Sequence, residues 1–381
     1  MGKCLDQQSR SLGGTYFNAL GDHDVAAAAA LPITQVREYA NPVPVVLFFG
    51  VPLGWTTTGN YLSMNVVCWQ GNPSHNQAGD FMRSARFHRY GDPDVLSVEE
   101  AAEPHAVANS VRIRVHAASV NPIDYLLRGG ALQEALPLGL PAIPGRDAAG
   151  LVDEVGEGVS NVRVGDLIFG LGGVSDTTAE FAVLTAWSAV PSTWSAEQGA
   201  AAGLASATAA TAIDALGDLT GRTLLIEGAS GGVGSAATVF ALAAGARVIG
   251  TARPENHQVL ADLGAAATTY GPGLAERVGA LAPEGVHAAF HAAPSASLPD
   301  LVAIVGDASR VVTVVDAEGA GRLGARAVNA VNDSALLERA ADLGRRGLYT
   351  PRVDRVLPLN SIREAHELAE SGSGKVVVTL T

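Results

Sequence analysis

The sequence predicts an α/β protein that joins a compact β domain to a doubly wound parallel sheet. A buried strand, a glycine-rich turn, a helix and a second strand follow one another between Thr223 and Arg253. Helical and extended segments keep alternating after Arg253, as crossovers between parallel strands require. Before this unit, short extended segments separated by turn residues are typical of a barrel-like β domain.

Length, composition and charge limit the class of function. The 381 residues allow two domains of ordinary size, and 48% hydrophobic with 17% charged residues is typical of a soluble α/β protein. A net charge of −13 argues against a nucleic-acid partner and leaves no basic face for a membrane. The only cysteines, Cys4 and Cys68, allow neither a disulfide framework nor a four-cysteine zinc lobe. Because no secretory signal is visible, we expect a cytoplasmic protein.

Residues 1–81 are not patterned like the rest of the chain. They contain the alanine run Ala26–Ala30 and scattered Pro, Asn and Gly, without a sustained period of 2 or 3.6 residues. A clean pattern begins at Met82. We therefore expect residues 1–81 to be an extension, poorly ordered or an artefact of start-site choice. The alternative is a genuine but unfamiliar N-terminal module.

The β domain is predicted over residues 82–203. Its clearest strand alternates Val111, Ile113 and Val115 with polar residues, as a half-buried strand does. Further strands and turns follow at Ala117–Tyr125, Pro141–Gly150, Leu151–Val155 and Leu167–Gly170. The C-terminal segment again contains short extended stretches, with strands predicted at Arg352–Leu357 and Lys375–Leu380. We therefore assign residues 346–381 to the same β domain.

Two capping boxes mark helix starts, at Ser195–Gln198 and at Ser361–Glu364. The first opens an alanine-rich helix through Ala200–Leu216 that leads into the parallel-sheet domain, which we assign to residues 204–345. Beyond Arg253 the alternating elements of that domain are a helix at Glu255–Leu263, a strand ending at Tyr270, a helix at Leu274–Leu281, and strands at Ala288–Ala292 and Arg310–Asp316.

The glycine-rich unit carries the clearest chemistry. A short apolar strand ends at Gly228, the glycines Gly231, Gly232 and Gly234 follow, and a helix is predicted over Ser235–Ala244 before the strand Ala246–Thr251. Glycines let the backbone approach a phosphate, and amides at a helix start point at the anion. The unit therefore predicts a site for a dinucleotide pyrophosphate. The alternative is a tight strand-to-helix turn that binds no ligand.

The end of the second strand favours NADPH. An NAD enzyme usually places Asp or Glu there to hold the ribose hydroxyls, whereas this chain has Thr251 and Arg253, with Asn256 close behind. A cation and hydroxyl groups suit a 2′-phosphate. The alternative is that Arg253 is a solvated surface arginine, because Glu255 lies beside it.

From about Met82 to Thr381 the chain resembles the zinc-independent medium-chain dehydrogenases/reductases of the quinone oxidoreductase (zeta-crystallin-like) branch. The resemblance rests on Asn121–Asp124, Ile143–Gly150, Val164–Asp166, Gly228–Gly234 and Gly374–Val378. It implies a GroES-like β-barrel-type catalytic domain and a Rossmann cofactor domain. It also implies a homodimer paired through an edge strand of the cofactor domain, here Arg310–Asp316.

The same resemblance implies no metal. Zinc alcohol dehydrogenases of this superfamily place a cysteine ligand where this chain has Asn121 and a histidine where it has Arg146. Neither substitute is a zinc ligand, so Lewis-acid oxidation of an alcohol is not expected. The nearby histidines share no metal-ligand spacing, and we expect surface or turn positions for His88, His105 and His116.

Without metal, the expected chemistry is hydride transfer from NADPH to a quinone or an α,β-unsaturated carbonyl (enone or enoyl) acceptor. Such an acceptor needs positioning and a hydrogen bond to its developing oxyanion. Asn121 is the candidate polar contact that faces nicotinamide and acceptor, or else it only makes the turn before Pro122. Tyr125 is the candidate proton donor, or else an aromatic wall of the pocket. We expect Asp124 to brace the loop.

The resemblance also implies the cofactor contacts. Amides of Ser230, Gly231, Gly232 and Val233 would bind the pyrophosphate, and Thr251, Arg253 and Asn256 would lie near the adenosine phosphate. Tyr270 would flank the adenine, Thr211 would pack near the nicotinamide, and Ala292 and Val315 would meet the cofactor at the fourth and fifth strands. The chain departs from its relatives at His287 and His291, where they usually have Asp, and at Glu227, where many have His.

A second class of function stays open. Some relatives in the lens and in regulation suggest a non-catalytic NADPH-binding sensor of the same fold. Turnover of NADPH with quinones or enones separates the enzyme from the sensor. A zinc alcohol dehydrogenase would require bound metal and alcohol-dependent reduction of NADP.

Overall fold

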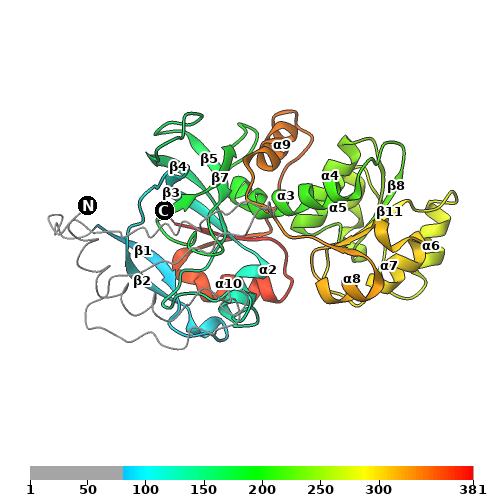
Figure 1. Cartoon of the computed structure of the whole chain (residues 1–381), viewed down its shortest axis with the longest axis horizontal. Helices are drawn as coiled ribbons and strands as arrows, with labels where there is room; N and C mark the ends of the chain where they lie inside the picture. Colours follow the sequence, from blue (N-terminus) through cyan, green and yellow to red (C-terminus); the bar gives the residue numbers. More distant parts are fainter. Residues whose placement is uncertain (1–79, 381) are drawn as a thin grey trace, which may run out of the picture. The chain divides into compact units, whose positions relative to one another are not determined.

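The computed structural model describes residues 80–380 (Figure 1). The expectation for residues 1–81 falls almost wholly outside these described residues. The first described strand, β1 (Phe81–Arg86), pairs antiparallel with β2 (Ser97–Ala102) in a small sheet of its own.

The cofactor half contains a six-stranded parallel sheet with the strand order β10-β9-β8-β11-β12-β13. Its strands are β8 (Thr223–Glu227), β9 (Arg247–Thr251), β10 (Ala266–Thr268), β11 (Ala288–His291), β12 (Val311–Thr313) and β13 (Arg326–Ala327). Its helices are α4 (Gly232–Ala243), α5 (His257–Asp262), α6 (Leu274–Leu281), α7 (Leu298–Val305) and α8 (Ala317–Leu323). The order reverses direction between β8 and β11, so a crevice for ligand is expected at the carboxyl ends of these two strands.

Both faces of this sheet are covered, which explains the unbroken apolar run of β8. Leu224 and Ile226 pack into the cluster that contains residues of α4, whereas Leu225 packs into the cluster on the other face with residues of α6, α7 and α8. All five residues of β8 are buried. The doubly wound sheet is confirmed.

The β domain is built on a seven-stranded sheet with the order β14-β15-β3-β4-β5-β7, in which β6 also pairs with β3. Its strands are β3 (Val111–Val120), β4 (Asp147–Val155), β5 (Leu167–Leu171), β6 (Phe181–Leu184), β7 (Ala186–Ala189), β14 (Arg355–Pro358) and β15 (Val376–Thr379). Helices α2 (Pro122–Arg128), α9 (Ser334–Arg345) and α10 (Ile362–Glu370) complete the described α-helices, apart from α3. Because β15 pairs directly with β3, the tail does belong to this sheet.

Helix α3 (Ala196–Leu216) contacts both halves of the described chain, since it packs on β4 and β5 and on α4 (Figure 1). The predicted capping box is present: Ser195 Oγ accepts from the Gln198 N–H, and the Gln198 side chain accepts from the Ser195 N–H. By length and composition α3 is apolar enough to cross a membrane, but 78% of its 18-residue apolar window is buried inside the protein. The helix also passes through the predicted boundary at residue 203, and the domain boundaries stay predictions.

Three predicted details are wrong. Ser361 makes no capping bond, because Leu359–Ser361 form a 3₁₀ turn that leads directly into α10. The strand predicted over Arg310–Asp316 is only Val311–Thr313 and is not an edge, because the two-residue β13 pairs on its far side. Tyr270 does not end a strand, since β10 stops at Thr268.

Candidate active site

The turn after β8 has the close contacts that exclude side chains. Gly228 has a φ of +76°, and a Cβ there would lie 2.8 Å from the Cβ of Ala293. A Cβ on Gly234 would lie 2.1 Å from the carbonyl oxygen of Gly228. Glycine is therefore required at position 228 for the turn to pass Ala293, and at position 234 for α4 to pack against the turn.

The helix that follows presents unpaired amides. Helix α4 begins at Gly232, and its N-cap residue is Gly231, which is exposed and supplies no capping side chain. The N–H groups of the first turn, including those of Gly232 and Val233, have no acceptor within the helix. With Ser230 half-buried beside them, this turn meets the requirements of a dinucleotide pyrophosphate site.

Thr251, at the end of β9, supports this turn through hydrogen bonds. It is fully buried, and its Oγ1 accepts a hydrogen bond from the Gly228 N–H at 3.3 Å. Its carbonyl oxygen accepts from the Ala229 N–H at 3.1 Å. Thr251 thus holds the turn in place, and its nearness to an adenosine phosphate stays a prediction.

The predicted phosphate-recognition residues lie just beyond β9. Arg253 pairs with Glu255 at 3.3 Å, and both side chains are largely exposed, which is the alternative that the sequence left open. Asn256 receives a hydrogen bond at its Oδ1 from Arg352 Nη1 at 3.3 Å. Arg352 was not predicted, because it reaches this place from the tail. The site therefore has a second guanidinium beside Asn256.

The remaining predicted cofactor residues lie in α3 and at the ends of three strands of the parallel sheet. The Thr211 hydroxyl donates to the Ala207 carbonyl within α3 at 2.8 Å, and the Ala292 N–H donates to the Glu227 carbonyl at 3.1 Å. Tyr270 and Val315 are exposed beyond the ends of β10 and β12. Their contacts with a cofactor stay predictions.

Asn121 lies in a buried polar cluster as well as at the start of α2. Its Nδ2 donates to Asp147 Oδ1 at 2.8 Å and to Ser119 Oγ at 3.1 Å. Its Oδ1 accepts from Lys375 Nζ at 2.6 Å. It is also the N-cap residue of α2, so the predicted role in the turn before Pro122 is confirmed, and its contact with nicotinamide and acceptor stays a prediction.

Lys375 is the principal residue that the sequence analysis missed. Its Nζ also donates to Ser119 Oγ at 2.8 Å, and its stem passes the phosphate turn, since a Cβ on Gly232 would lie 3.8 Å from Lys375 Cδ. Burial lowers its pKa, while Asp147 and Asp124 oppose that shift. One signal was available: this is one of two lysines in the chain, directly before an apolar strand.

Asp124 braces the loop as expected, but only one of its oxygens does so. Asp124 Oδ2 accepts from the Asn121 backbone N–H at 2.7 Å. Among the described residues, Oδ1 is buried and has no hydrogen-bond partner. Burial, and then the negative charge of Asp147, raise the pKa of Asp124 to about 7.

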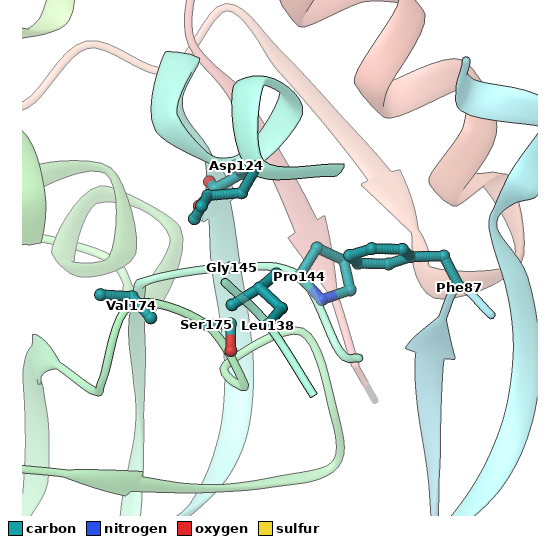
Figure 2. A pocket seen from close by; sticks show the side chains of 8 residues that line it. Phe87, Asp124, Leu138, Pro144, Gly145, Val174 and Ser175 are labelled. Carbon is teal, nitrogen blue, oxygen red and sulfur yellow. The ribbon is translucent and has the colours of Figure 1, made fainter. Parts of the chain in front are cut away.

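A closed apolar pocket adjoins Asp124, and it is too small to hold a water molecule (Figure 2). It is lined by Phe87, Asp124, Leu127, Leu138, Pro144, Gly145, Val174 and Ser175. Tyr125 does not line this pocket. Burial raises the pKa of Tyr125, and the charges of Glu370 and Asp124 add to the shift.

The positions that hold zinc in related enzymes have other partners here. Arg146 Nη2 donates to Asn332 Oδ1 at 3.2 Å. His88 and His105 are exposed and pair with Glu99 and Glu154, as expected for surface histidines. Within residues 80–380, no group of three or more His, Cys, Asp or Glu side chains is placed to hold a metal ion.

A second buried polar cluster joins the carboxyl ends of β8, β11 and β12. Glu227 Oε1 accepts from Ser295 Oγ at 2.9 Å, and Ser297 Oγ donates to Glu227 Oε2. His291 contacts Ser295 at 3.1 Å and Thr313 at 2.9 Å. Burial lowers the pKa of His291. Two of the departures from the family pattern, Glu227 and His291, therefore face each other at 3.5 Å.

Fold and site together define a medium-chain dehydrogenase/reductase, and the chain belongs to that family. The alcohol dehydrogenase GroES-like domain matches residues 107–213, and the zinc-binding dehydrogenase domain matches residues 263–378. Together these two matches cover more than half of the chain.

Within the family the chain is similar to quinone oxidoreductases. It is 37% identical over 183 residues to the quinone oxidoreductase of Rattus norvegicus and 39% identical over 181 residues to that of Sus scrofa. These matches cover 47% and 46% of this chain and 55% and 54% of the relatives, so the chain spans about half the length of the curated relatives it matches. The quinone oxidoreductase structure from Coxiella burnetii is 28% identical, with a TM-score of 0.69 over 79% of this chain and 100% of that one.

Proposed function

We propose that this protein is a zinc-independent, NADPH-dependent oxidoreductase that reduces a quinone or an α,β-unsaturated carbonyl compound. One observation carries the proposal. Lys375 lies against Gly232 of the phosphate turn and bonds Asn121, which bonds Asp124 at the apolar pocket. The phosphate turn and the start of α2 thus share one polar cluster.

The chain's own residues supply binding and positioning. A reduced nicotinamide bound at the glycine turn would supply a hydride. The amides at the start of α4 bind phosphate, and the ammonium of Lys375 adds a positive charge beside them. Asn121 forms hydrogen bonds with Ser119, Asp147 and Lys375. Its amide is therefore already oriented, and no reorganisation energy is needed when the reaction takes place.

The preference for NADPH is supported by the surroundings of Asn256. Arg253 precedes it in the chain and Arg352 donates to it, so two guanidiniums are available for a 2′-phosphate. Glu255 neutralises part of the charge of Arg253, and Asp354 does the same for Arg352. We therefore expect a preference for NADPH over NADH of about tenfold to a hundredfold, the range that one or two phosphate contacts provide.

We propose that zinc takes no part in the mechanism because of the side chains at Asn121 and Arg146, the two positions where related enzymes hold zinc ligands. An amide at Asn121 and a guanidinium at Arg146 do not ligate zinc, and both are engaged with protein partners. Elemental analysis of active protein should therefore find no stoichiometric zinc, and chelators should leave the rate unchanged. A chelator-sensitive rate that added zinc restores would contradict this part of the proposal.

The decisive experiment follows the nicotinamide absorbance of NADPH with a panel of quinones, enones and saturated ketones. We expect oxidation with quinones or enones and none with saturated ketones or alcohols. Tight binding of NADPH without turnover on any acceptor would support a non-catalytic NADPH sensor, which the narrowness of the pocket favours. Failure to bind either NADPH or NADH would overturn both functions.

We also propose that the protein is a cytoplasmic homodimer. Because β13 is the outer strand of the described parallel sheet at that end, it is the edge through which a second copy would pair. Light scattering on the purified protein gives the oligomeric state directly. A monomer at micromolar concentration would contradict the proposal.

A further inference from the structure

The carboxyl end of the parallel sheet holds a chain of hydrogen-bonded side chains that the proposed mechanism does not use. Its members are Glu227 at the end of β8, His291 at the end of β11, Thr313 at the end of β12 and Ser295 in the loop between β11 and α7. Glu227 is 2% exposed, and His291 and Thr313 are fully buried. Burying such groups costs free energy unless each has hydrogen-bond partners, so the partners show which segments the chain joins.

The hydrogen bonds run in one direction at Thr313. Its Oγ1 accepts from the backbone N–H groups of Val315 and Asp316, each at 3.2 Å. Because a hydroxyl oxygen has two lone pairs and one proton, the Thr313 O–H group donates to His291 Nδ1, which lies 2.9 Å away. Nδ1 is therefore the ring nitrogen without a proton, and the proton of the neutral imidazole lies on Nε2.

The other side of the imidazole faces the loop 292–297. His291 Nε2 lies 3.1 Å from Ser295 Oγ and 3.5 Å from Glu227 Oε2. The hydroxyls of Ser295 and Ser297 both donate to the carboxylate of Glu227, so Ser295 Oγ can accept from Nε2–H. The imidazole therefore joins the loop after β11 to the turn after β12.

Both segments lie at the edge of the sheet where a dinucleotide would bind. The strand order reverses between β8 and β11, and ligands of such sheets occupy the crevice at the carboxyl ends of these strands. The loop 292–297 also packs against the glycine turn, because Ala293 Cβ lies 2.8 Å from the position that a Cβ on Gly228 would take. A displacement of this loop therefore changes the packing of the glycine turn.

The arrangement has no place for a second proton on His291. That proton would lie on Nδ1 and point at Thr313 Oγ1, whose lone pairs already accept from Val315 and Asp316. Thr313 would have to rotate and release at least one of these two N–H groups. Two charged groups face the ring, Glu227 on β8 and Asp316 after β12, and both favour its protonation. Burial opposes protonation more strongly, so the pKa of His291 lies below its ordinary value.

We propose that His291 is a positioning residue of the dinucleotide site. With a single proton, on Nε2, it holds the loop 292–297 and the turn 313–316 in place. A second proton, taken from solvent onto Nδ1, releases the turn and weakens dinucleotide binding. This assignment rests on the function proposed above, because it concerns the same cofactor site.

The first test needs no cofactor. Nitrogen NMR spectra of the cofactor-free protein at neutral pH should show the His291 ring, whose signals are missing from His291→Gln, with a proton on Nε2 and none on Nδ1. On acidification, the hydrogen-exchange protection of the Val315 and Asp316 amides should fall by about fivefold, the effect of one hydrogen bond, at the pH where this ring titrates. The coincidence of these two changes in the wild type tests the proposal even if the variant does not fold.

Three results of this test would overturn the proposal. The first is a proton on Nδ1 at neutral pH. The second is a pair of amides at Val315 and Asp316 that stay protected after the ring has titrated. The third is a ring that remains neutral until the whole protein unfolds.

The second test is the pH dependence of the dissociation constant for NADH, measured by nicotinamide fluorescence. NADH is the probe because the 2′-phosphate of NADPH itself titrates, with a pKa of about 6. The wild-type dissociation constant should rise by about fivefold to tenfold as His291 gains its second proton. His291→Gln offers an acceptor oxygen to Thr313 and a donor N–H to Ser295, and it should show no such rise because its amide does not titrate. His287→Gln is the control, since His287 precedes the opposite end of β11, and it should keep the wild-type profile.

The outcomes distinguish this proposal from the proposed function. If the protein binds NADH and His291→Gln shows the same rise in acid as the wild type, His291 does not control the site, and the oxidoreductase proposal stands. If the amides of Val315 and Asp316 lose protection while the affinity stays constant, the two segments do not position the dinucleotide, and the proposal is likewise overturned. If neither NADPH nor NADH binds at any pH, the proposed function fails, and the role of His291 fails with it.

Discussion

Lys375 Nζ donates a hydrogen bond of 2.6 Å to Asn121 Oδ1. The lysine directly precedes β15, and the asparagine follows β3, the neighbouring strand in the sheet. Because β15 pairs with β3 in a fixed register, with Val376 opposite Val120, the two side chains meet at the ends of their strands. The register of two strands from distant parts of the sequence therefore positions the polar cluster.

Replacing Lys375 by Met should weaken cofactor binding. The substitution keeps the stem that passes Gly232 and removes the ammonium that bonds Asn121 and Ser119. We expect the dissociation constant for NADPH, measured by nicotinamide fluorescence, to rise by about tenfold to a hundredfold. Arg163→Met, at a largely exposed position in the same domain, is the control. Equal affinities for K375M and wild type would show that the lysine is purely structural.

Removing either guanidinium near Asn256 should reduce the preference for NADPH. Arg253→Ala and Arg352→Ala should each lower the ratio of kcat/KM for NADPH to that for NADH by about tenfold. Arg247→Ala is the matched control. Arg247 is an exposed arginine that pairs with Glu284 at the start of β9, whereas Arg253 follows the other end of that strand. Parallel losses with both cofactors would assign these residues to folding instead of phosphate recognition.

Two glycine-to-alanine changes should have opposite effects. Gly234→Ala places a Cβ at 2.1 Å from the Gly228 oxygen, so we expect a loss of stability of about 2 kcal/mol or more together with loss of cofactor binding. Gly279→Ala lies inside α6, where a Cβ meets nothing within 4 Å. It should stabilise the protein by about 0.5–1 kcal/mol in chemical denaturation, because alanine restricts the unfolded chain.

His366 should make the protein sensitive to acid. It is 1% exposed and contacts Arg128 at 3.1 Å, and burial together with that guanidinium lowers its pKa to about 3. The unfolded chain binds this proton near pH 6.5 and the folded chain does not, so stability is lost as the pH falls from about 6.5 to about 3. The loss attributable to this residue is about 1.4 kcal/mol per pH unit.

His366→Gln can still accept from Arg128 and should shift the acid-unfolding midpoint to lower pH. His105→Gln, at an exposed position, should not. If the midpoint of H366Q coincided with that of the wild type, the buried imidazole would not be the group that titrates.

Local patterns were sufficient for the parallel sheet and the glycine turn. The apolar run of β8 and the glycines after it reflect contacts made within one strand–turn–helix unit, so the sequence displays them directly. The capping boxes show the limit of such patterns. Ser195 has an extended backbone and caps, whereas Ser361, with φ −97° and ψ 24°, already belongs to a helical turn and its side chain does not cap.

The missed residues depend on contacts between distant segments. Lys375 and Arg352 come from the tail and meet residues of β3 and of the β9–α5 connection only because the tail pairs with β3. The raised pKa of Asp124 depends in the same way on the charge of Asp147, which comes from another strand. No spacing within the sequence reports these contacts.

The mutual contact of Glu227 and His291 limits how either position can change. With one partner replaced by an apolar residue, the other remains a buried polar group that has lost a polar contact, at a cost of about 1–3 kcal/mol. A chain that moved toward the arrangement usual in its relatives, with histidine on β8 and aspartate on β11, would therefore pass through a less stable single mutant. We therefore expect the double substitution to cost less stability than the two single substitutions added together, because the two buried side chains contact each other.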